Sequence, residues 1–264
     1  MIKTLKAGVA AGTLAVALFA AGGAHAQVVG LVDGKTLVMI DPAAKKVTSK
    51  VEISGAGPIL GIDVRPADGM LYGIAGDGNI VTIDPKTGKA TMKSKLSESW
   101  KAGVMTTFDF NPVADRLRLM SSEGVSLRIN VDDGKAMVDG SHKFKEGDAN
   151  AGKTPKVVAG AYTNSLKGGA KPTATALYNI DATTGSLVSQ APPNDGVLNT
   201  IGSLGVTVTG PVAFEIGASA GDKNDAWLVA GGALHSVDLK TGKATAVGKI
   251  EGLSGNLTDI AWMN

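Results

Sequence analysis

Apolar residues from Gln27 onward either alternate with polar ones or form short blocks of four to eight, which Gly, Asn, Asp and Pro interrupt. Alternation is typical of half-buried β-strands, and short apolar blocks are typical of fully buried ones. No long stretch repeats its apolar residues at helical spacing. The pattern therefore predicts an all-β fold of short strands joined by tight turns.

A turn motif recurs along the chain, in which Asp is followed four positions later by Gly. It occurs at Asp84, Asp181 and Asp238, with looser versions at Asp41 and Asn130. An Asp side chain can accept hydrogen bonds from backbone amides two residues on, while Gly takes the left-handed conformation. The motif predicts hairpin turns. The turn at Asp181 falls one hairpin earlier in its unit than those at Asp84 and Asp238.

A second repeat marks one strand per unit. Its five copies begin at Gly61, Thr107, Ala159, Pro211 and Asp259, and these starts are 46, 52, 52 and 48 residues apart. A period of about 40–50 residues with about four strands per unit is typical of a β-propeller. We predict five blades of about four antiparallel strands; six blades and a double-sheet fold stay open as alternatives.

Two columns of this repeat have a physical explanation. Large apolar side chains would fill the wedge between neighbouring sheets, and small ones would suit inner strands that crowd the axis. The large column is Val64, Phe110, Tyr162, Phe214 and Trp262. The small column is Asp63, Asp109, Ala161, Ala213 and Ala261.

The two ends of the chain complete one blade. Residues 27–53 supply three strand-like segments without an inner strand, and residues 259–264 supply an inner strand that nothing follows. Joining the C-terminal strand to the N-terminal three closes the ring and removes two unpaired edges. We therefore expect residues 27–264 to form a single propeller domain.

The first 26 residues predict an export signal. Lys3 and Lys6 precede an apolar stretch over residues 7–21, and Ala24 and Ala26 supply the small residues of a cleavage site. The apolar stretch is shorter than the ~20 residues that a membrane-spanning helix needs. We predict a signal peptide cleaved after Ala26, a periplasmic or secreted protein, and no membrane span.

Composition narrows the possible chemistry. The 264 residues contain no Cys, which excludes disulfides, thiolate nucleophiles and Cys-ligated metals. The formal net charge of +2 comes from the two leader lysines, so the predicted mature chain is neutral. Nucleic-acid binding would need a concentrated basic surface. We therefore expect no nucleic-acid partner.

Two motifs match catalytic patterns by letter alone. Residues 147–154 read G-x-x-x-x-G-K-T, but a phosphate loop needs a strand before it and a helix after it. Ser219 lies in a G-x-S-x-G pattern, but a polar loop follows it where a helix is required. The predicted mature chain holds only His142, expected in a surface loop, and His235, expected in a hairpin strand. We predict no catalytic residues, no cofactor and no histidine metal centre.

Polar residues at the ends of the inner strands are the candidate ligand-binding site. They are Asp63, Arg65, Asp109, Asn111, Thr163 and Glu215. Propeller ligands usually bind at an axial mouth, which is an analogy between folds. The structural alternative is that Asp63 and Asp109 bond backbone amides while Arg65 pairs with Glu215. A bound cation is a subsidiary option, since three carboxylates are hard oxygen ligands.

Several segments of the chain, in the same order, resemble a known family. They are residues 109–118, 128–130, 147–152, 161–164, 176–181 and 199–205. Together they resemble the bacterial exported proteins of domain-of-unknown-function family 4394. Family versions of residues 147–152 commonly lack the following lysine, which also argues against a nucleotide loop. The resemblance implies no established activity, cofactor or catalytic residue.

These observations favour a monomeric, noncatalytic binding module for an unknown small molecule or protein. The main alternative is a periplasmic hydrolase of the lactonase kind, with a cation held by Asp63, Asp109 and Glu215. A third possibility is a structural, envelope-associated protein whose axis is plugged.

Overall fold

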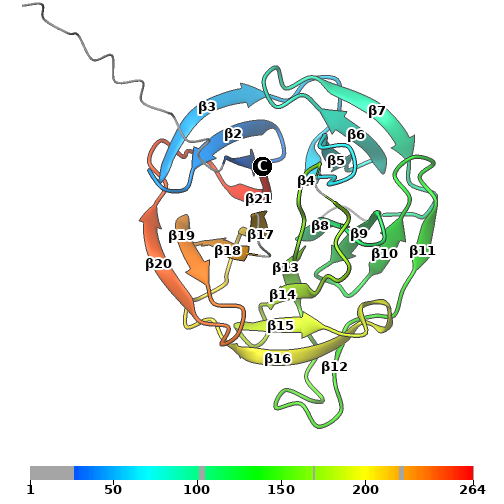
Figure 1. Ribbon diagram of the computed structural model, residues 1–264, viewed down its shortest axis with the longest axis vertical. Coiled ribbons are helices and arrows are strands. Elements are labelled where there is room, and N and C mark those ends of the chain that lie inside the picture. Colours follow the sequence, from blue (N-terminus) through cyan, green and yellow to red (C-terminus); the bar gives the residue numbers. More distant parts are fainter. Residues whose placement is uncertain (1–26, 101–104, 169, 220–222, 264) are drawn as a thin grey trace, which may run out of the picture.

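The computed structural model describes residues 27–100, 105–168, 170–219 and 223–263. Five antiparallel sheets form a ring about a central axis (Figure 1). The described residues contain no α-helix, only a 3-10 turn at Pro193–Asp195. The predicted five-bladed β-propeller is therefore confirmed. The predicted signal peptide, residues 1–26, lies outside the described residues.

Each blade consists of four strands ordered from the axis to the rim. Blade 1 is β21 (Leu257–Trp262), β1 (Val28–Val32), β2 (Thr36–Asp41) and β3 (Lys46–Glu52). Blade 2 is β4 (Ile59–Val64), β5 (Leu71–Ala75), β6 (Asn79–Ile83) and β7 (Ala90–Lys95). Blade 3 is β8 (Thr106–Asn111), β9 (Arg116–Ser121), β10 (Ser126–Ile129) and β11 (Ala136–Val138).

The other two blades follow the same order. Blade 4 is β13 (Val157–Tyr162), β14 (Leu177–Asp181), β15 (Ser186–Gln190) and β16 (Val197–Ser203). A short fifth strand that the sequence did not predict, β12 (Lys143–Phe144), pairs in parallel with β16. Blade 5 is β17 (Val212–Ser219), β18 (Lys223–Ala230), β19 (Ala233–Val237) and β20 (Ala244–Lys249).

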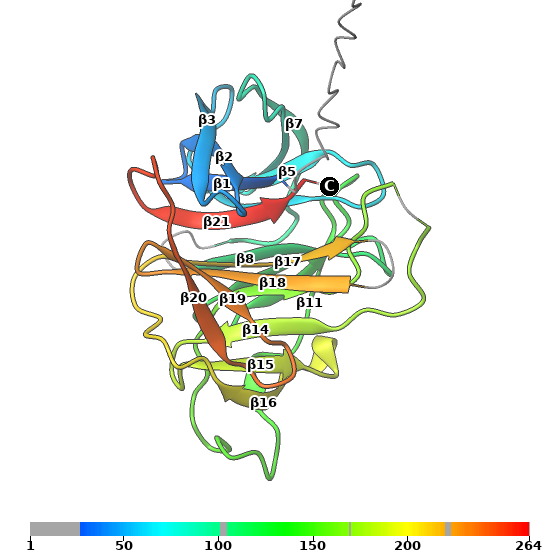
Figure 2. The same ribbon diagram turned by 60° about the vertical axis from the view of Figure 1, so that its left-hand side comes forward.

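The ring closes as the sequence predicts. β21 pairs antiparallel with β1, with Val28 opposite Trp262 and Gly30 opposite Ile260. Figure 1 shows red β21 beside the blue strands of blade 1, and Figure 2 shows the same pairing from the side. Every blade therefore has an inner strand, and these five are called the inner strands below: β4, β8, β13, β17 and β21.

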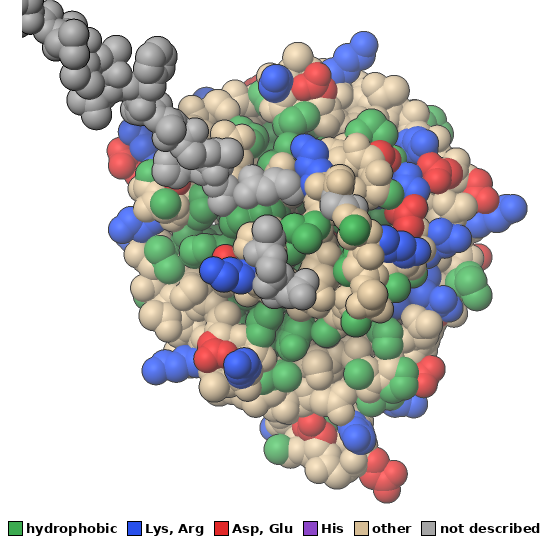
Figure 3. Space-filling model, viewed as in Figure 1, with side chains coloured by type: hydrophobic (Ala, Val, Ile, Leu, Met, Phe, Trp, Pro, Cys, Tyr) green, Lys and Arg blue, Asp and Glu red, His purple; other side chains and the backbone are tan. Residues whose placement is uncertain are grey.

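Burial decreases from the axis to the rim. All six residues of β13 are buried, whereas most of β3 and β7 and half of β20 are exposed. Neighbouring blades cover both faces of an inner strand, but an outer strand lies at the perimeter, where charged side chains also protect its free edge. On the face seen in Figure 3, hydrophobic side chains surround the centre, and basic and acidic ones lie mainly toward the rim.

A cluster of buried apolar side chains lies at each of the five junctions between neighbouring blades. The large column of the repeat contributes to these clusters, for example through Phe110, whose ring meets that of Tyr72 on β5 edge to face at 5.3 Å. The small column includes Ala161, Ala213 and Ala261, all fully buried. The two columns thus have the roles that the sequence predicts.

The turns also match their predictions. The Asp84 and Asp238 turns join the third and fourth strands of their blades, and the Asp181 turn joins the second and third, one hairpin earlier. In the Asp84 turn, Oδ1 accepts hydrogen bonds from the backbone amides of Lys86 and Thr87. Gly88 has φ +71°, and a Cβ there would lie 2.0 Å from a backbone oxygen, so this position requires glycine.

Candidate functional site

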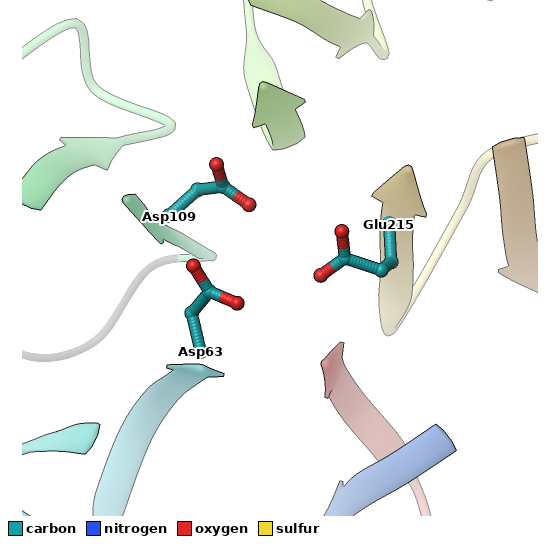
Figure 4. Close-up of side chains that lie close together, drawn as sticks. All are labelled: Asp63, Asp109 and Glu215. Carbon is teal, nitrogen blue, oxygen red and sulfur yellow. The ribbon is translucent and has the colours of Figure 1, made fainter. Parts of the chain in front are cut away.

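Four carboxylates converge at the centre of the ring. Asp63, Asp109 and Glu215 come from β4, β8 and β17, and one carboxylate oxygen of each lies within 4.8 Å of the other two. Figure 4 shows these three side chains pointing toward one another. Asp259 on β21 is the fourth. All four are at least nine-tenths buried. We call these four residues the axial carboxylates.

Three axial carboxylates link neighbouring inner strands. Asp259 accepts a hydrogen bond from the amide of Ile62 on β4, Asp63 accepts one from Phe110 on β8, and Asp109 accepts one from Tyr162 on β13, at 2.8–2.9 Å. Inner strands turn one backbone edge toward the axis, and its buried amides need acceptors. The carboxylates therefore stabilise the inside of the ring, which is the structural role considered for Asp63 and Asp109.

The same four groups carry a large electrostatic cost. Burial raises the pKa of Asp63 to about 7, although hydrogen bonds from two backbone amides lower it. Burial raises the pKa of Asp109, Glu215 and Asp259 well above their ordinary values, and the charge of Asp63 adds to each shift. No Lys, Arg or His of the described residues forms an ion pair with any of the four. Their mutual repulsion is therefore uncompensated within the described chain.

Arg65 lies elsewhere than the sequence suggests. Its guanidinium contacts Asp115 at 2.6 Å, Asp132 at 3.1 Å and Asp68 at 3.3 Å, and these partners lie in turns of blades 2 and 3. The Asp115 hydrogen bond raises the pKa of Arg65 above its ordinary value. The expected pairing of Arg65 with Glu215 is therefore wrong, because the guanidinium forms ion pairs with the three turn carboxylates instead.

Asn111 and Thr163 have local structural partners. The side-chain oxygen of Asn111 accepts hydrogen bonds from the amides of Val113 and Ala114, which forms the turn after β8. The hydroxyl oxygen of Thr163 accepts a hydrogen bond from the amide of Ala176, which immediately precedes β14. Of the six predicted site residues, the structure brings together Asp63, Asp109 and Glu215. Arg65, Asn111 and Thr163 are not part of this cluster.

Asp259 is the axial carboxylate that the sequence reasoning missed. Its signal was present, because it is a carboxylate within the apolar strand β21 and stands in the first column of the repeat. Gly61 occupies the same column on β4, and a Cβ there would lie 3.2 Å from Asp259 Oδ2 and 2.6 Å from Phe108 Cβ. Glycine at this position therefore leaves room for the carboxylate beside the next blade.

A pocket opens at the mouth where the inner strands begin, called the start mouth below. It has a volume of about 610 Å³ and is lined mainly by apolar residues, including Ile59, Leu60, Met105 and Val212. Polar lining residues include Lys156 and Thr258. The predicted polar column lies near the opposite mouth, where these strands end. The pocket therefore lies at the end of the ring opposite to the predicted polar column.

His142 also differs from its expectation. It is 9% exposed and its Nε2 lies 3.3 Å from Met120 Sδ, so it is buried between blades 3 and 4 and does not lie in a surface loop. Burial, and secondly the charge of Arg118, lower the pKa of His142 to about 4. His235 lies in strand β19, as predicted.

The fold defines a five-bladed β-propeller with buried acidic residues at its axis and an open pocket at one mouth. A profile of the family described as domain of unknown function DUF4394 matches residues 36–261. The chain belongs to this family. No curated protein matches the chain.

Several solved structures are similar to the chain at low identity. A protein of unknown function from Bacteroides thetaiotaomicron has a TM-score of 0.52 and 14% identity, with 90% of this chain and 64% of that chain covered. One from Bacteroides caccae has a TM-score of 0.44 and 11% identity, with 87% and 74% covered. An auxiliary nutrient binding protein from Bacteroides ovatus has a TM-score of 0.48 and 13% identity, with 76% and 55% covered. The first of these likenesses supports the fold alone.

Proposed function

We propose that this protein is a noncatalytic binding module that takes a small, largely apolar anion in the pocket at the start mouth. The observation that carries the proposal is the pocket itself, because about 610 Å³ of mainly apolar lining is typical of small-molecule sites. Propellers often bind ligands at an axial mouth, which agrees with this position.

The charge of the ligand follows from the polar lining. Asp33 Oδ1 accepts hydrogen bonds from the backbone and side-chain amides of Asn256. Among the described residues, the ammonium of Lys156 has no ion-pair or hydrogen-bond partner. Asp33 keeps its charge but already accepts these hydrogen bonds, whereas Lys156 is the one basic side chain of the lining. A carboxylate or sulfonate on an apolar body would pair with Lys156.

Binding of 1-anilinonaphthalene-8-sulfonate, an apolar anion, tests the proposal. We expect one molecule to bind per chain with enhanced fluorescence. Lys156→Glu should weaken binding at least tenfold, and Met105→Trp should block it by filling the pocket. Lys145→Glu reverses an exposed charge outside the pocket and should leave binding unchanged. Equal binding by wild type and both pocket variants, with circular dichroism showing folded protein, would contradict the proposal.

The hydrolase alternative has one supporting observation, which is the convergence of Asp63, Asp109 and Glu215. Its test is turnover of an aliphatic lactone by the purified chain in calcium-containing buffer. Sustained turnover that Asp109→Asn abolishes would replace the binding module with an enzyme. Equal background rates for wild type and variant would remove the alternative.

We also propose that the protein is exported and cleaved after Ala26. The order of a charged segment, an apolar segment and small residues in positions 1–26 supports this. Among the described residues, no helix is long and apolar enough to cross a membrane. Mass spectrometry of the protein from a periplasmic extract should give a chain that begins at Gln27. An intact Met1 in the cytoplasmic fraction would contradict export.

A further inference from the structure

The axial carboxylates lack the positive charge that buried acidic groups normally have. Buried charges are usually paired with basic groups or bound to metal ions, because removing them from water is costly. Here four carboxyl groups lie together and are at most 8% exposed, with no basic partner among the described residues. Either protons or a cation must compensate the cluster.

A second observation points to a ligand at the axis. The hydroxyl oxygen of Thr107 is buried and has no hydrogen-bond partner among the described residues, and Thr107 is only 3% exposed. Buried hydroxyls are almost always bonded. Successive residues of a strand point to opposite faces, so Thr107 lies on the same face of β8 as Asp109. A neutral oxygen without a partner among the described residues therefore lies on the same face of β8 as Asp109.

We propose that Asp63, Asp109 and Glu215 bind one hard divalent cation of the size of calcium at the propeller axis, with the Thr107 hydroxyl as a neutral oxygen beside it. The chemistry fits, because calcium prefers carboxylate, hydroxyl and carbonyl oxygens at 2.3–2.6 Å. Two oxygens bound to the same calcium can be at most about 5 Å apart. The three carboxylates meet this limit, since one oxygen of each lies within 4.8 Å of the other two.

Available lone pairs support the same assignment. Both oxygens of Asp63 accept backbone hydrogen bonds, from Val64 and Phe110. Asp109 uses only Oδ1 in this way, and Glu215 only Oε1. Oδ2 of Asp109 and Oε2 of Glu215 accept no hydrogen bond from the described residues. Figure 4 shows the side chains of Asp109 and Glu215 approaching the centre from opposite sides. These two oxygens are the ones most free to hold a cation.

The cation would lie below the floor of the start-mouth pocket. Leu60 and Thr106 line the pocket, and Asp63 and Asp109 follow three residues later on the same strands, about 10 Å deeper at 3.4 Å per residue. The inference rests on the carboxylates and does not depend on the ligand proposed for the pocket. A cation here would link three blades at their inner edges.

Calcium titration of the full chain tests the site. Protein stripped with a chelator at pH 8 is titrated with calcium chloride in a calorimeter, and its thermal midpoint is measured with and without calcium. We expect one calcium per chain by elemental analysis, and a midpoint that rises with calcium concentration because the ion binds only the folded state.

Matched variants locate the ion. Asp109→Asn keeps an oxygen for the Tyr162 amide but loses the charge, and it should weaken calcium binding at least a hundredfold; Glu215→Gln should do the same. Thr107→Val replaces the hydroxyl with a methyl group of similar size, and it should weaken calcium binding about threefold to tenfold. Asp133→Asn removes an exposed turn carboxylate and should have no effect.

Two results would overturn the site. One is a stripped protein that takes up no calcium and shows no change in its thermal midpoint, which would mean that protons alone compensate the cluster. The other is a set of folded axial variants that bind calcium as tightly as wild type. The naphthalene-sulfonate probe, measured in chelator, reports on the pocket separately, so failure of the cation site and failure of the proposed function are distinguishable.

Discussion

The junction between blades 3 and 4 and the centre of the ring both bury charged side chains, but only the junction balances them. At the junction, the guanidinium of Arg118 contacts Asp139, and Arg128 contacts the same carboxylate at 2.7 Å. Arg118 also donates to Asn194 at 2.8 Å and to the Tyr162 hydroxyl at 3.3 Å. At the axis, four carboxyl groups have no basic partner among the described residues.

The comparison separates two uses of a buried carboxylate. In the network around Arg118 and Asp139, the buried carboxylate has basic partners within the chain. The network lies beside the smallest of the apolar clusters between blades, so its role is to stabilise that junction. The axial carboxylates are incomplete within the described chain, because their charge exceeds what backbone amides compensate. Removing a charge should therefore harm the junction and relieve the axis when no cation is bound.

The largest effect is expected from Arg118→Met. The substitution leaves the buried carboxylate of Asp139 with Arg128 alone and removes donors to Tyr162 and Asn194. Breaking a buried ion pair on one side typically costs about 3–5 kcal/mol, and we expect a loss of this size in the free energy of unfolding by urea. Arg116→Met, at the exposed start of the same strand, is the control, with less than about 0.5 kcal/mol. A loss below about 1 kcal/mol for Arg118→Met would show that the network is dispensable.

The same substitution should have different consequences in the two regions. In calcium-free protein at pH 8, Asp139→Asn should lose about 2–4 kcal/mol, because two guanidinium groups lose their carboxylate. Asp109→Asn should be neutral or stabilising. Burial and the neighbouring carboxylates raise the pKa of Asp109, so its ionisation at high pH opposes folding, and an amide avoids this. Urea unfolding of both variants checks the contrast; equal losses would refute it.

His142 gives the junction a pH dependence of its own. Its pKa is lowered from 6.5 to about 4, mainly by burial, and it faces Met120, the charge of Arg118 and, more distantly, Asp181. Between these two pH values the unfolded chain binds a proton at His142 that the folded chain does not. The free energy of unfolding therefore decreases as the pH falls from about 6.5 to about 4.

Substitution of His142 isolates that contribution from other titrating groups. The stability of wild type relative to His142→Leu should fall with decreasing pH, by at most about 1.4 kcal/mol per pH unit. Urea unfolding at pH 7.0, 5.5 and 4.5 measures the difference. Parallel curves for the two proteins would mean that His142 is protonated in the folded state as readily as in the unfolded chain.

The smallest effect is expected from an exposed pair. Lys46 and Glu251 approach to 3.9 Å with side chains that are 57% and 75% exposed, so water screens their attraction. Glu251→Gln should change the free energy of unfolding by less than about 0.5 kcal/mol in the same urea assay. A loss above about 1 kcal/mol would mean that exposed charges matter as much as the two buried regions.

The fold was largely predictable from local pattern. The five copies of the inner-strand repeat and the Asp-to-Gly turns each depend on a few neighbouring residues, so sequence spacing reveals them directly. The short strand β12 was missed because Lys143 and Phe144 carry no alternating pattern and pair only where β16 happens to lie. His142 was misplaced for the same reason, since its burial depends on Met120 of another blade.

The candidate site was only partly predictable. The sequence selected Asp63, Asp109 and Glu215 from columns of the repeat, and these three do converge. It could not show that Arg65 turns to Asp115, because that choice depends on which turn is nearest in space. It also pointed to the mouth where the inner strands end, whereas the pocket lies where they begin.

The sequence by itself determined the all-β architecture and favoured five blades and a ring closed by the two chain ends, because periodicity and repeat spacing are local properties of the chain. The tertiary structure decided which charges meet. Asp259 bonds the amide of Ile62 across 197 positions of sequence, and the axial cluster gathers carboxylates from four blades. Electrostatic interaction depends on distance and on exclusion of water, and both arise only when the ring closes.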